Sequence, residues 1–331
     1  MKKRIVVMVL TLFIVSLWGT MVFAKEAGNQ ANNGKGKVIQ VKKEFSKAKK
    51  EVKSKSQSVK IRKMVREFVD VQNDWAREEV MEATVKGFVY GYEDFSFKPN
   101  SPVTNMETIV LILRAQGLED EVKNYNLSDE QTALLKKIPD WGKNYIAVAL
   151  ENGLLKPEEL QKFNPQQGVK RYEVCMFMAR TLEADSVTDS VYEKAFTDEL
   201  QIPAANRAEA RLMWMNNVIN GYPDGSFNPM RVVKRNEIAV MLNKLDDNCL
   251  QGSASSAIIG TIKDIKAIEG GYAITVENEK GVNTVVNTTA ETKLFYSGKL
   301  LTSINLSSSQ NVKILLDEDK EAVLVRITDA S

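Results

Sequence analysis

Apolar positions along the chain follow two spacings, which predict helices first and strands afterwards. Up to residue 247, short apolar runs at helical spacing end at glycines or turn residues, as in amphipathic helices. Beyond residue 256, β-branched runs of five or six residues alternate with turn signals. We expect six strands there: 258–262, 272–277, 284–288, 292–296, 311–316 and 322–327. So many short strands predict a small, barrel-like all-β domain.

One unit occurs three times in the helical part. Phe-x-Pro triplets begin at Phe97, Phe163 and Phe227, which are 66 and 64 residues apart. Eight residues after each proline stands a glutamate: Glu107, Glu173 or Glu237. The same offsets align Asp74-Trp75 with Asp140-Trp141, and they place Ala204-Ala205 in the third copy. These anchors align without gaps, so chance is a poor explanation and the pattern indicates an internal repeat.

Each copy predicts a helix–loop–helix unit. The first helix starts near the Asp-Trp pair, where an aspartate can accept hydrogen bonds from free N–H groups, and it ends at Gly87 or Gly153. A turn precedes the Phe-x-Pro triplet, whose Phe we expect to be buried, but residues 154–161 form a longer polar loop in the second copy. The second helix begins near Thr104, Lys170 or Lys234. One such unit has too small an apolar face to be stable alone, whereas three can share a core.

The composition narrows the possible chemistry. The chain has no histidine, which removes the commonest general base, the histidine-containing triads and most zinc sites. Cys175 and Cys249 lack metal-ligand spacing, so we expect free thiols, with a disulfide as the open alternative. The strand region has no nucleophile elbow and no paired acids in a visible motif, and we interpret Asp317 and Asp319 as turn residues rather than calcium ligands. We therefore expect no enzyme activity, metal or cofactor.

The N-terminus has the features of an export signal. A basic start at residues 2–4 precedes an apolar run at 5–17, and Val22 and Ala24 are small residues before a probable cleavage point. The run is too short to be a convincing membrane span, and an uncleaved anchor is the alternative. We expect residues 1–24 to be a signal peptide and the protein to be secreted.

A basic segment follows the expected signal. Residues 25–67 hold 14 Lys and Arg against 4 Asp and Glu, a net charge of +10, whereas residues 68–331 carry −11. We interpret the segment as a basic arm for an anionic wall polymer or a membrane surface, with a solvated spacer helix as the alternative. Export and an acidic remainder argue against nucleic acid as a partner.

The repeats resemble S-layer homology domains over residues 68–247. The family pattern runs from Asp-Trp through Gly-Tyr-x-Asp-Gly-x-Phe-x-Pro to Ile-Thr-Arg-Ala-Glu. The last element reads Val-Thr-Asn-Met-Glu at 103–107, Val-Lys-Arg-Tyr-Glu at 169–173 and Val-Lys-Arg-Asn-Glu at 233–237. Three copies in a row after an export signal make the resemblance specific.

The resemblance implies a pseudo-threefold helical assembly whose grooves bind secondary cell-wall polysaccharide, often carrying pyruvate ketals. A guanidinium can hold a ketal carboxylate through two parallel hydrogen bonds, and an aromatic ring can pack on the sugar. The implied polysaccharide-binding residues are Arg171, Arg235, Trp75, Trp141, Asp74, Asp140, Glu173, Glu237 and Asn105. We expect the acidic residues, together with Glu107, to cap helices and orient the arginines.

The copies depart from the pattern in different ways. Asn105 stands where the first copy would have the arginine, which removes a charged contact worth about 1.5–3 kcal/mol. The third copy keeps Arg235 but lacks the Asp-Trp pair. Only the second copy keeps both features, so we expect it to provide the best groove.

The predicted protein is multidomain, with mainly α-helical repeats followed by the small β domain. The expected segments are a signal peptide at 1–24, a basic arm at 25–67, repeats at 68–120, 121–185 and 186–247, a linker at 248–255 and the β domain at 256–331. We expect a cell-surface protein of the S-layer type, anchored non-covalently through its repeats, with a structural or interaction role. The alternatives are a secreted adaptor whose degenerate repeats no longer bind polymer and a wall-anchored enzyme.

Overall fold

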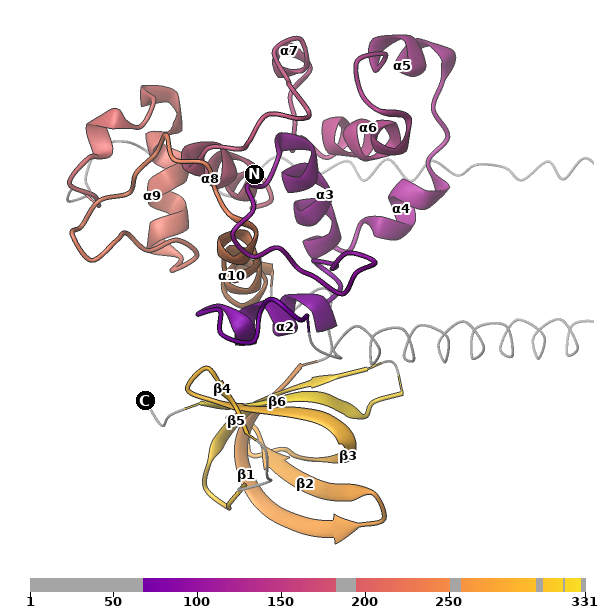
Figure 1. The fold of residues 1–331 in the computed structure, drawn as a ribbon, viewed down its shortest axis with the longest axis vertical. Helices are drawn as coiled ribbons and strands as arrows, with labels where there is room; N and C mark the ends of the chain where they lie inside the picture. The colour runs from indigo at the N-terminus through magenta and orange to yellow at the C-terminus, as the bar shows by residue number, and fades with distance from the viewer. Residues whose placement is uncertain (1–67, 183–194, 251–256, 302–305, 318, 329–331) are drawn as a thin grey trace, which may run out of the picture. The chain divides into compact units, whose positions relative to one another are not determined.

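The computed structural model describes residues 68–182, 195–250, 257–301, 306–317 and 319–328 (Figure 1). The predicted signal peptide and basic arm lie outside these residues. The first residues of the predicted linker, 248–250, belong to a π-helical segment, Asp246–Leu250, and residues 251–256 are outside the described part. None of the helices in the described ranges is long and apolar enough to cross a membrane.

The predicted helix–loop–helix units are present in all three copies. The first helices are α2 (Arg77–Val85), α6 (Lys143–Glu151) and α9 (Arg207–Met215), and the second helices are α3 (Asn105–Ala115), α8 (Arg171–Ala179) and α10 (Arg235–Leu245). Additional short helices are α4 (Glu119–Asn124), α5 (Asp129–Leu134) and α7 (Pro157–Leu160), with 3₁₀ turns at Asp140–Gly142, Glu199–Gln201 and Ala204–Asn206. Helix α7 lies in the polar loop that sets the second copy apart.

The first helices end in the same left-handed conformation. Gly87 and Gly153, at which the sequence predicted these helices to end, have φ angles of 76° and 70°. Asn217 takes the corresponding position in the third copy with φ 54°. Asparagine is one of the few side chains that tolerate this region, so the third copy stops its helix without a glycine.

A glutamate fixes the start of each second helix. The backbone N–H of Thr104 donates to Glu107 Oε2 over 2.8 Å, and Lys170 and Lys234 donate likewise to Glu173 and Glu237 over 2.7 and 2.9 Å. Each bond satisfies an N–H group that the helix itself leaves unpaired. The expectation that these glutamates cap helices agrees with these bonds.

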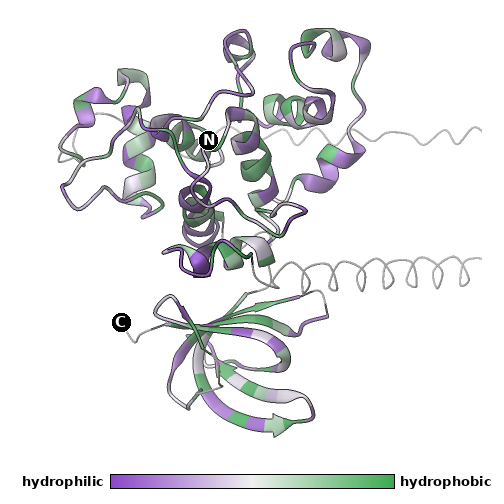
Figure 2. Cartoon of the chain, viewed as in Figure 1, coloured by the Kyte–Doolittle hydropathy of each residue, from purple (hydrophilic) through white to green (hydrophobic). Residues whose placement is uncertain are grey.

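The three copies share one core. Val103, Val169 and Val233, which precede the second helices, are fully buried in it. Their backbones form a closed ring, in which Val103 N–H donates to Val233 O, Val233 N–H to Val169 O and Val169 N–H to Val103 O, over 2.9–3.0 Å. Many helices and strands mix hydrophobic and hydrophilic residues along their length (Figure 2), as expected for elements that are buried on one side. Helix α3, by contrast, is buried over most of its surface.

The C-terminal strands form a six-stranded sheet in the order β2-β1-β5-β6-β3-β4, and β2 also pairs with β3. The strands are β1 (Ala257–Ile268), β2 (Gly271–Glu277), β3 (Asn283–Tyr296), β4 (Lys299–Leu300), β5 (Asn311–Leu316) and β6 (Ala322–Thr328). The two strands predicted at 284–288 and 292–296 were wrong as separate elements. They form the single strand β3, whose register against β6 shifts between Thr288 and Lys293, so the chain bulges there instead of turning.

Helix α2 of the first copy contacts this sheet through an apolar cluster. Met81 and Val85 of α2 are buried with four residues of the sheet: Phe295, Leu315, Val323 and Leu324. Burial of these apolar side chains removes their surface from water, and this hydrophobic effect is the main favourable contribution to the contact.

Charged side chains surround the apolar cluster. The Lys313 ammonium lies 2.5 Å from Glu82 and 2.6 Å from Asp247, and Lys86 lies 2.9 Å from both Glu82 and Asp246. Glu82 and Asp246 are fully buried, and Lys86 and Lys313 nearly so. Burial by itself would raise the pKa of Glu82, but the charges of Lys86 and Lys313 and their hydrogen bonds lower it overall.

Candidate functional site

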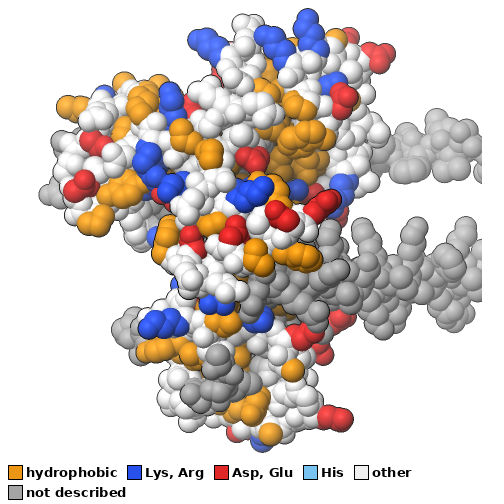
Figure 3. All heavy atoms as spheres, viewed as in Figure 1, with side chains coloured by type: hydrophobic (Ala, Val, Ile, Leu, Met, Phe, Trp, Pro, Cys, Tyr) orange, Lys and Arg blue, Asp and Glu red, His pale blue; other side chains and the backbone are white. Residues whose placement is uncertain are grey.

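Each second helix begins against the Phe-x-Pro loop of another copy. The backbone N–H of Asn105 donates to Gln167 O over 2.8 Å, that of Arg171 to Arg231 O over 3.0 Å, and that of Arg235 to Ser101 O over 3.0 Å. We call these contacts the 1/2, 2/3 and 3/1 junctions, by the copies that they join. Across the face of the molecule in Figure 3, basic, acidic and hydrophobic side chains are interspersed.

Each nitrogen of the Arg235 guanidinium has a partner at the 3/1 junction. Its Nε donates to Phe97 O over 2.8 Å and its Nη2 to Tyr90 O over 3.0 Å, and its Nη1 lies 3.6 Å from Glu107. The guanidinium carbon is 4.8 Å from the ring centre of Phe97 and 5.1 Å from that of Tyr92. Through these bonds Arg235 holds the loop of the first copy. Because Arg235 is only 7% exposed, its positive charge lies just beneath the surface.

Arg171 has the same place at the 2/3 junction but fewer partners. Its Nη2 donates to Asn220 O over 2.8 Å, and its guanidinium lies 5.1 Å from the Tyr222 ring and 5.2 Å from the Phe227 ring. Its Nε is buried without a hydrogen-bond partner among the described residues. Within the same part of the chain, no carboxylate forms an ion pair with Arg171.

The 1/2 junction keeps the backbone contact and loses the charge. Asn105 Nδ2 donates to Asn164 O over 3.1 Å, while its Oδ1 has no partner within the described part of the chain. Asn105 is buried to a similar extent as the arginines, at 8% exposure. A neutral amide therefore fills the position that a guanidinium occupies in the other two junctions.

The Asp-Trp pair belongs to a different junction from the one that alignment within a copy suggests. Asn236 follows Arg235 on α10, and its Nδ2 donates to Asp74 Oδ2 of the first copy over 3.1 Å. Asp74 Oδ1 also accepts from Ala76 N–H over 2.9 Å. The 3/1 junction thus combines the arginine and Asn236 of the third copy with Asp74 of the first. Sequence reasoning missed this because it compared residues within copies, whereas each junction draws on two.

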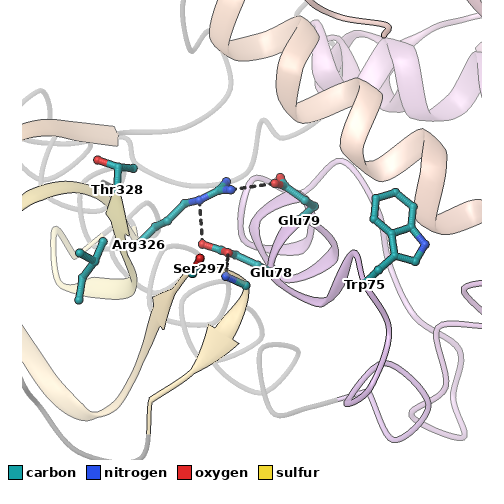
Figure 4. A pocket seen from close by; sticks show the side chains of 8 residues that line it. Trp75, Glu78, Glu79, Ser297, Arg326 and Thr328 are labelled. Atoms are coloured by element: carbon teal, nitrogen blue, oxygen red, sulfur yellow. Dashed lines mark hydrogen bonds and ion pairs between the residues drawn. The ribbon is translucent and has the colours of Figure 1, made fainter. Parts of the chain in front are cut away.

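The two tryptophans are exposed, and one borders a cavity. Trp75 is 67% and Trp141 59% exposed. Trp75 lines one side of a cavity of about 380 Å³, and Arg326 of β6 lines the other (Figure 4). Arg326 Nε lies 2.7 Å from Glu78, and its Nη2 donates to Glu79 over 2.9 Å. The second copy differs, since the Asp140 side chain is almost fully exposed and pairs with Lys143 over 2.7 Å.

The remaining glutamate oxygens have unequal partners. Glu173 Oε1 accepts from the Tyr172 hydroxyl over 3.2 Å, and burial followed by the charge of Glu173 raises the pKa of Tyr172 to about 12. Glu237 pairs with Arg231, so it holds an arginine other than the one expected from the repeat pattern. Among the three motif glutamates, only Glu107 forms a described ion pair with an arginine that starts a second helix, Arg235.

Two aspartates that sequence reasoning did not single out hold the Phe-x-Pro loops. Asp70 accepts from the backbone N–H groups of Phe97 and Lys98, both over 2.8 Å. Asp198 accepts in the same way from Phe227 and Asn228, over 2.7 and 2.8 Å. The sequence signal was a shared Phe-x-Asp at 68–70 and 196–198, which the second copy replaces with Leu-Leu-Lys at 134–136.

The two cysteines are free, in agreement with the expectation from their spacing. Cys175 is fully buried in α8, and burial raises the pKa of its thiol to about 12. A thiol with this pKa is protonated at neutral pH and unreactive.

A family comparison bears directly on the three junctions. The model of the S-layer homology domain matches residues 67–109, 135–175 and 214–239. The chain carries three S-layer homology repeats. The third match starts after Ala204-Ala205, as expected for the copy that lacks the Asp-Trp pair. Each match includes a Phe-x-Pro loop and the start of a second helix, the two elements that form the junctions.

Several proteins are similar in sequence to the repeat part of the chain. A cellulosome-anchoring protein of Acetivibrio thermocellus is 28% identical over 132 residues, which are 40% of this chain and 29% of that protein. A surface-layer 125 kDa protein of Lysinibacillus sphaericus is 27% identical over 38% of this chain and 10% of its own length. An amylopullulanase of Thermoanaerobacterium thermosulfurigenes is 24% identical over 53% of this chain and 9% of the enzyme. The chain therefore spans less than a third of each of these relatives.

Proposed function

We propose that the protein is exported and attached non-covalently to the cell surface through its S-layer homology repeats, which bind secondary cell-wall polysaccharide at the junctions. The observation that carries this proposal is the burial of Arg171 and Arg235 at two inter-repeat junctions, each beside aromatic rings. The family match and the surface-layer and cellulosome-anchoring relatives support anchoring.

The arginine chemistry suits an acidic sugar. A guanidinium donates paired hydrogen bonds to a carboxylate, such as that of a pyruvate ketal, and burial strengthens the attraction. The exposed Trp75 and Trp141 offer flat apolar faces for sugar rings. At the 3/1 junction Asn236, the residue after Arg235, contacts Asp74 of the first copy, so we propose this junction as a site in place of a groove built from the second copy alone.

The overall organisation remains part of the proposal. We infer a pseudo-threefold assembly of repeats at about 68–120, 121–185 and 186–247, supported by the closed ring of valine backbone bonds. The additional pairing of β2 with β3 supports a barrel-like curvature of the β domain. We propose a structural or interaction role for the whole protein rather than an enzymatic one, because the amylopullulanase match covers only 9% of that enzyme.

A sedimentation assay tests the anchoring. The protein lacking residues 1–24 is mixed with purified wall sacculi, with or without chemical removal of the wall polysaccharide. We expect it to pellet with intact sacculi and to stay in solution with stripped ones. Equal pelleting on both preparations would contradict anchoring through the polysaccharide. No pelleting with intact sacculi would favour a secreted adaptor whose repeats no longer bind polymer.

A variant pair tests the junctions. We expect Arg171→Ala to weaken pelleting about tenfold, because it removes a charge-assisted contact. The matched Asn105→Ala variant removes a neutral side chain at the corresponding position and should have a much smaller effect. Equal losses in the two variants would contradict the assignment of the junctions as binding sites.

A further inference from the structure

Arg231 is a second cation that only the third copy carries. It stands two residues after the proline of the Phe-x-Pro triplet, where the first copy has Ser101 and the second Gln167. The motif that defines the repeats does not specify this position. Its backbone carbonyl accepts the N–H of Arg171 over 3.0 Å, so the two arginines are neighbours across the 2/3 junction.

The two guanidinium groups share one aromatic ring. The guanidinium carbon of Arg171 lies 5.1 Å, and that of Arg231 5.3 Å, from the ring centre of Tyr222. At these distances a ring attracts a cation, so Tyr222 steadies both groups in spite of their mutual repulsion. At the 3/1 junction, by contrast, the corresponding Ser101 adds no charge beside Arg235.

Both arginines of the 2/3 junction retain hydrogen-bonding capacity. The Nε atoms of Arg171 and Arg231 are buried and have no partner within the described residues. A buried charged donor without an acceptor is unfavourable, whereas Arg235 Nε has its acceptor in Phe97 O. Both guanidinium groups therefore have a donor that the described residues leave unsatisfied.

The charge balance of the junction is positive. Arg231 pairs with Glu237, while Arg171 has no carboxylate partner in the part of the chain that the structure describes. The Arg231 side chain is 34% exposed, so an incoming group can reach it from solvent. An anionic ligand would meet one unneutralised guanidinium and a second one beside it.

We propose that Arg231 is a specificity-determining residue that makes the 2/3 junction the acidic-group subsite, in which a carboxylate carried on a sugar binds between Arg171 and Arg231. This inference rests on the proposed polysaccharide binding and adds that the three junctions contact different parts of the polymer. The 3/1 junction, whose arginine is already engaged, contacts less strongly charged parts of the polymer, and the neutral 1/2 junction serves the fold.

Binding of soluble wall polysaccharide tests this assignment. The probes are the polysaccharide released from sacculi and the same polymer after amidation of its carboxylates with carbodiimide and methylamine. Calorimetry compares the protein lacking residues 1–24 with Arg231→Gln, which copies the second repeat, and with Arg231→Lys, which keeps the charge. We expect Arg231→Gln to lower affinity for the untreated polymer about tenfold and for the amidated polymer less than twofold. Arg231→Lys should recover part of the affinity.

Several outcomes separate the possible failures. Unchanged affinity of Arg231→Gln for the untreated polymer, together with a loss in Arg171→Ala, overturns the role of Arg231 and leaves the anchoring intact. Equal losses on both polymers also overturn the subsite, because the effect then does not depend on a carboxylate. If the unaltered protein does not bind the untreated polymer, the proposed function itself fails. Urea unfolding of each variant identifies losses that come from a less stable fold.

Discussion

The first and second repeats have the same helix–loop–helix plan and use it differently. In the first repeat, Phe97 is fully buried beneath Arg235, and Asp70 holds the loop. In the second, Phe163 is only partly buried, and the loop contains the extra helix α7. The repeat fold therefore accommodates one Phe-x-Pro loop with a partly buried phenylalanine when the loops of the other copies bury theirs fully.

The side chains at aligned positions of the two first helices, α2 and α6, differ even more. Glu82 of α2 contacts Lys313 of the sheet, whereas the aligned position on α6 is Val148. Likewise Glu78 aligns with Asn144. The repeat fold does not need these charges, so the first copy carries them for its contact with the β domain. The first helix of the first copy is therefore specialised for contact with the β domain, whereas that of the second copy lacks these charges.

The largest effect should come from removing the charge that only the first repeat carries. Glu82→Gln removes the buried carboxylate that Lys86 and Lys313 share and leaves Asp246 and Asp247 as their acidic partners. We expect it to lower the free energy of unfolding by about 3–4 kcal/mol. Urea denaturation measures the change. Glu151→Gln, an exposed substitution on α6, serves as the control and should cost less than about 0.5 kcal/mol. A similarly small loss of unfolding free energy in both variants would show that the charge of α2 does not stabilise its contact with the β domain.

The pH dependence sharpens the same contrast. The pKa of Glu82 is lower than its ordinary value of 4.5, since the charges of Lys86 and Lys313 outweigh the effect of burial. A carboxyl with a lowered folded pKa adds stability above its unfolded pKa and loses it as the pH falls through the folded pKa. We expect the free energy of unfolding to decline below about pH 4.5, and the decline to be shallower in Glu82→Gln. Parallel profiles would contradict this origin of the acid sensitivity.

The buried aromatic residues should show the next largest difference. Phe97→Ala opens a cavity under Arg235 and should cost about 3 kcal/mol. Phe163→Ala removes a ring that is only partly buried, so its cost should be well below half of that. Thermal and urea unfolding of the two variants test the comparison, which equal costs would break.

Loop closure by aspartate should have an intermediate effect. Asp70→Asn weakens two charge-assisted hydrogen bonds to the loop, and we expect a loss of about 1.5–2 kcal/mol. Asp198→Asn should behave alike, because its contacts have the same geometry. If hydrogen exchange of the Phe97 and Phe227 amides stayed as slow as in the unaltered protein, these aspartates would not hold the loops.

The smallest effect concerns the two aligned aspartates. Asp74→Ala loses a helix-start hydrogen bond and the contact with Asn236, and should cost about 1 kcal/mol. Asp140→Ala removes a solvent-exposed carboxylate and should change stability by less than about 0.5 kcal/mol. Urea unfolding distinguishes them, and a larger loss in Asp140→Ala would reverse our interpretation of the two copies.

Much of the fold was predictable from local signals. Phe-x-Pro, the glutamate eight residues later and the terminal glycines located the helices because they act within a few residues of one another. The ends of the first helix in the third copy required Asn217 in a conformation that glycine normally takes. Strand β3 was divided in the prediction because residues 289–291, Thr-Ala-Glu, have no large apolar side chain. Pairing with β2 before this segment and with β6 on both sides of it keeps the strand continuous.

The candidate site was less accessible to sequence reasoning. Arg171 and Arg235 were found through the motif, but their partners lie 49 and 145 residues away along the chain, at Asn220 and Tyr90. Nothing local reveals that a copy's arginine faces the loop of a different copy. Arg231 escaped notice for the same reason, since its meaning depends on Arg171 across the junction.

The closed ring of valine backbone bonds has a consequence for the time at which the protein becomes functional. Val233 must meet Val103, which the ribosome makes 130 residues earlier, before the ring is complete. A chain that stops before the third repeat has two open ends instead of a ring, with the N–H of Val103 unpaired at one and the C=O of Val169 unpaired at the other. Such a chain would expose apolar surface and be open to proteases. The ring therefore closes only in a chain that contains all three repeats.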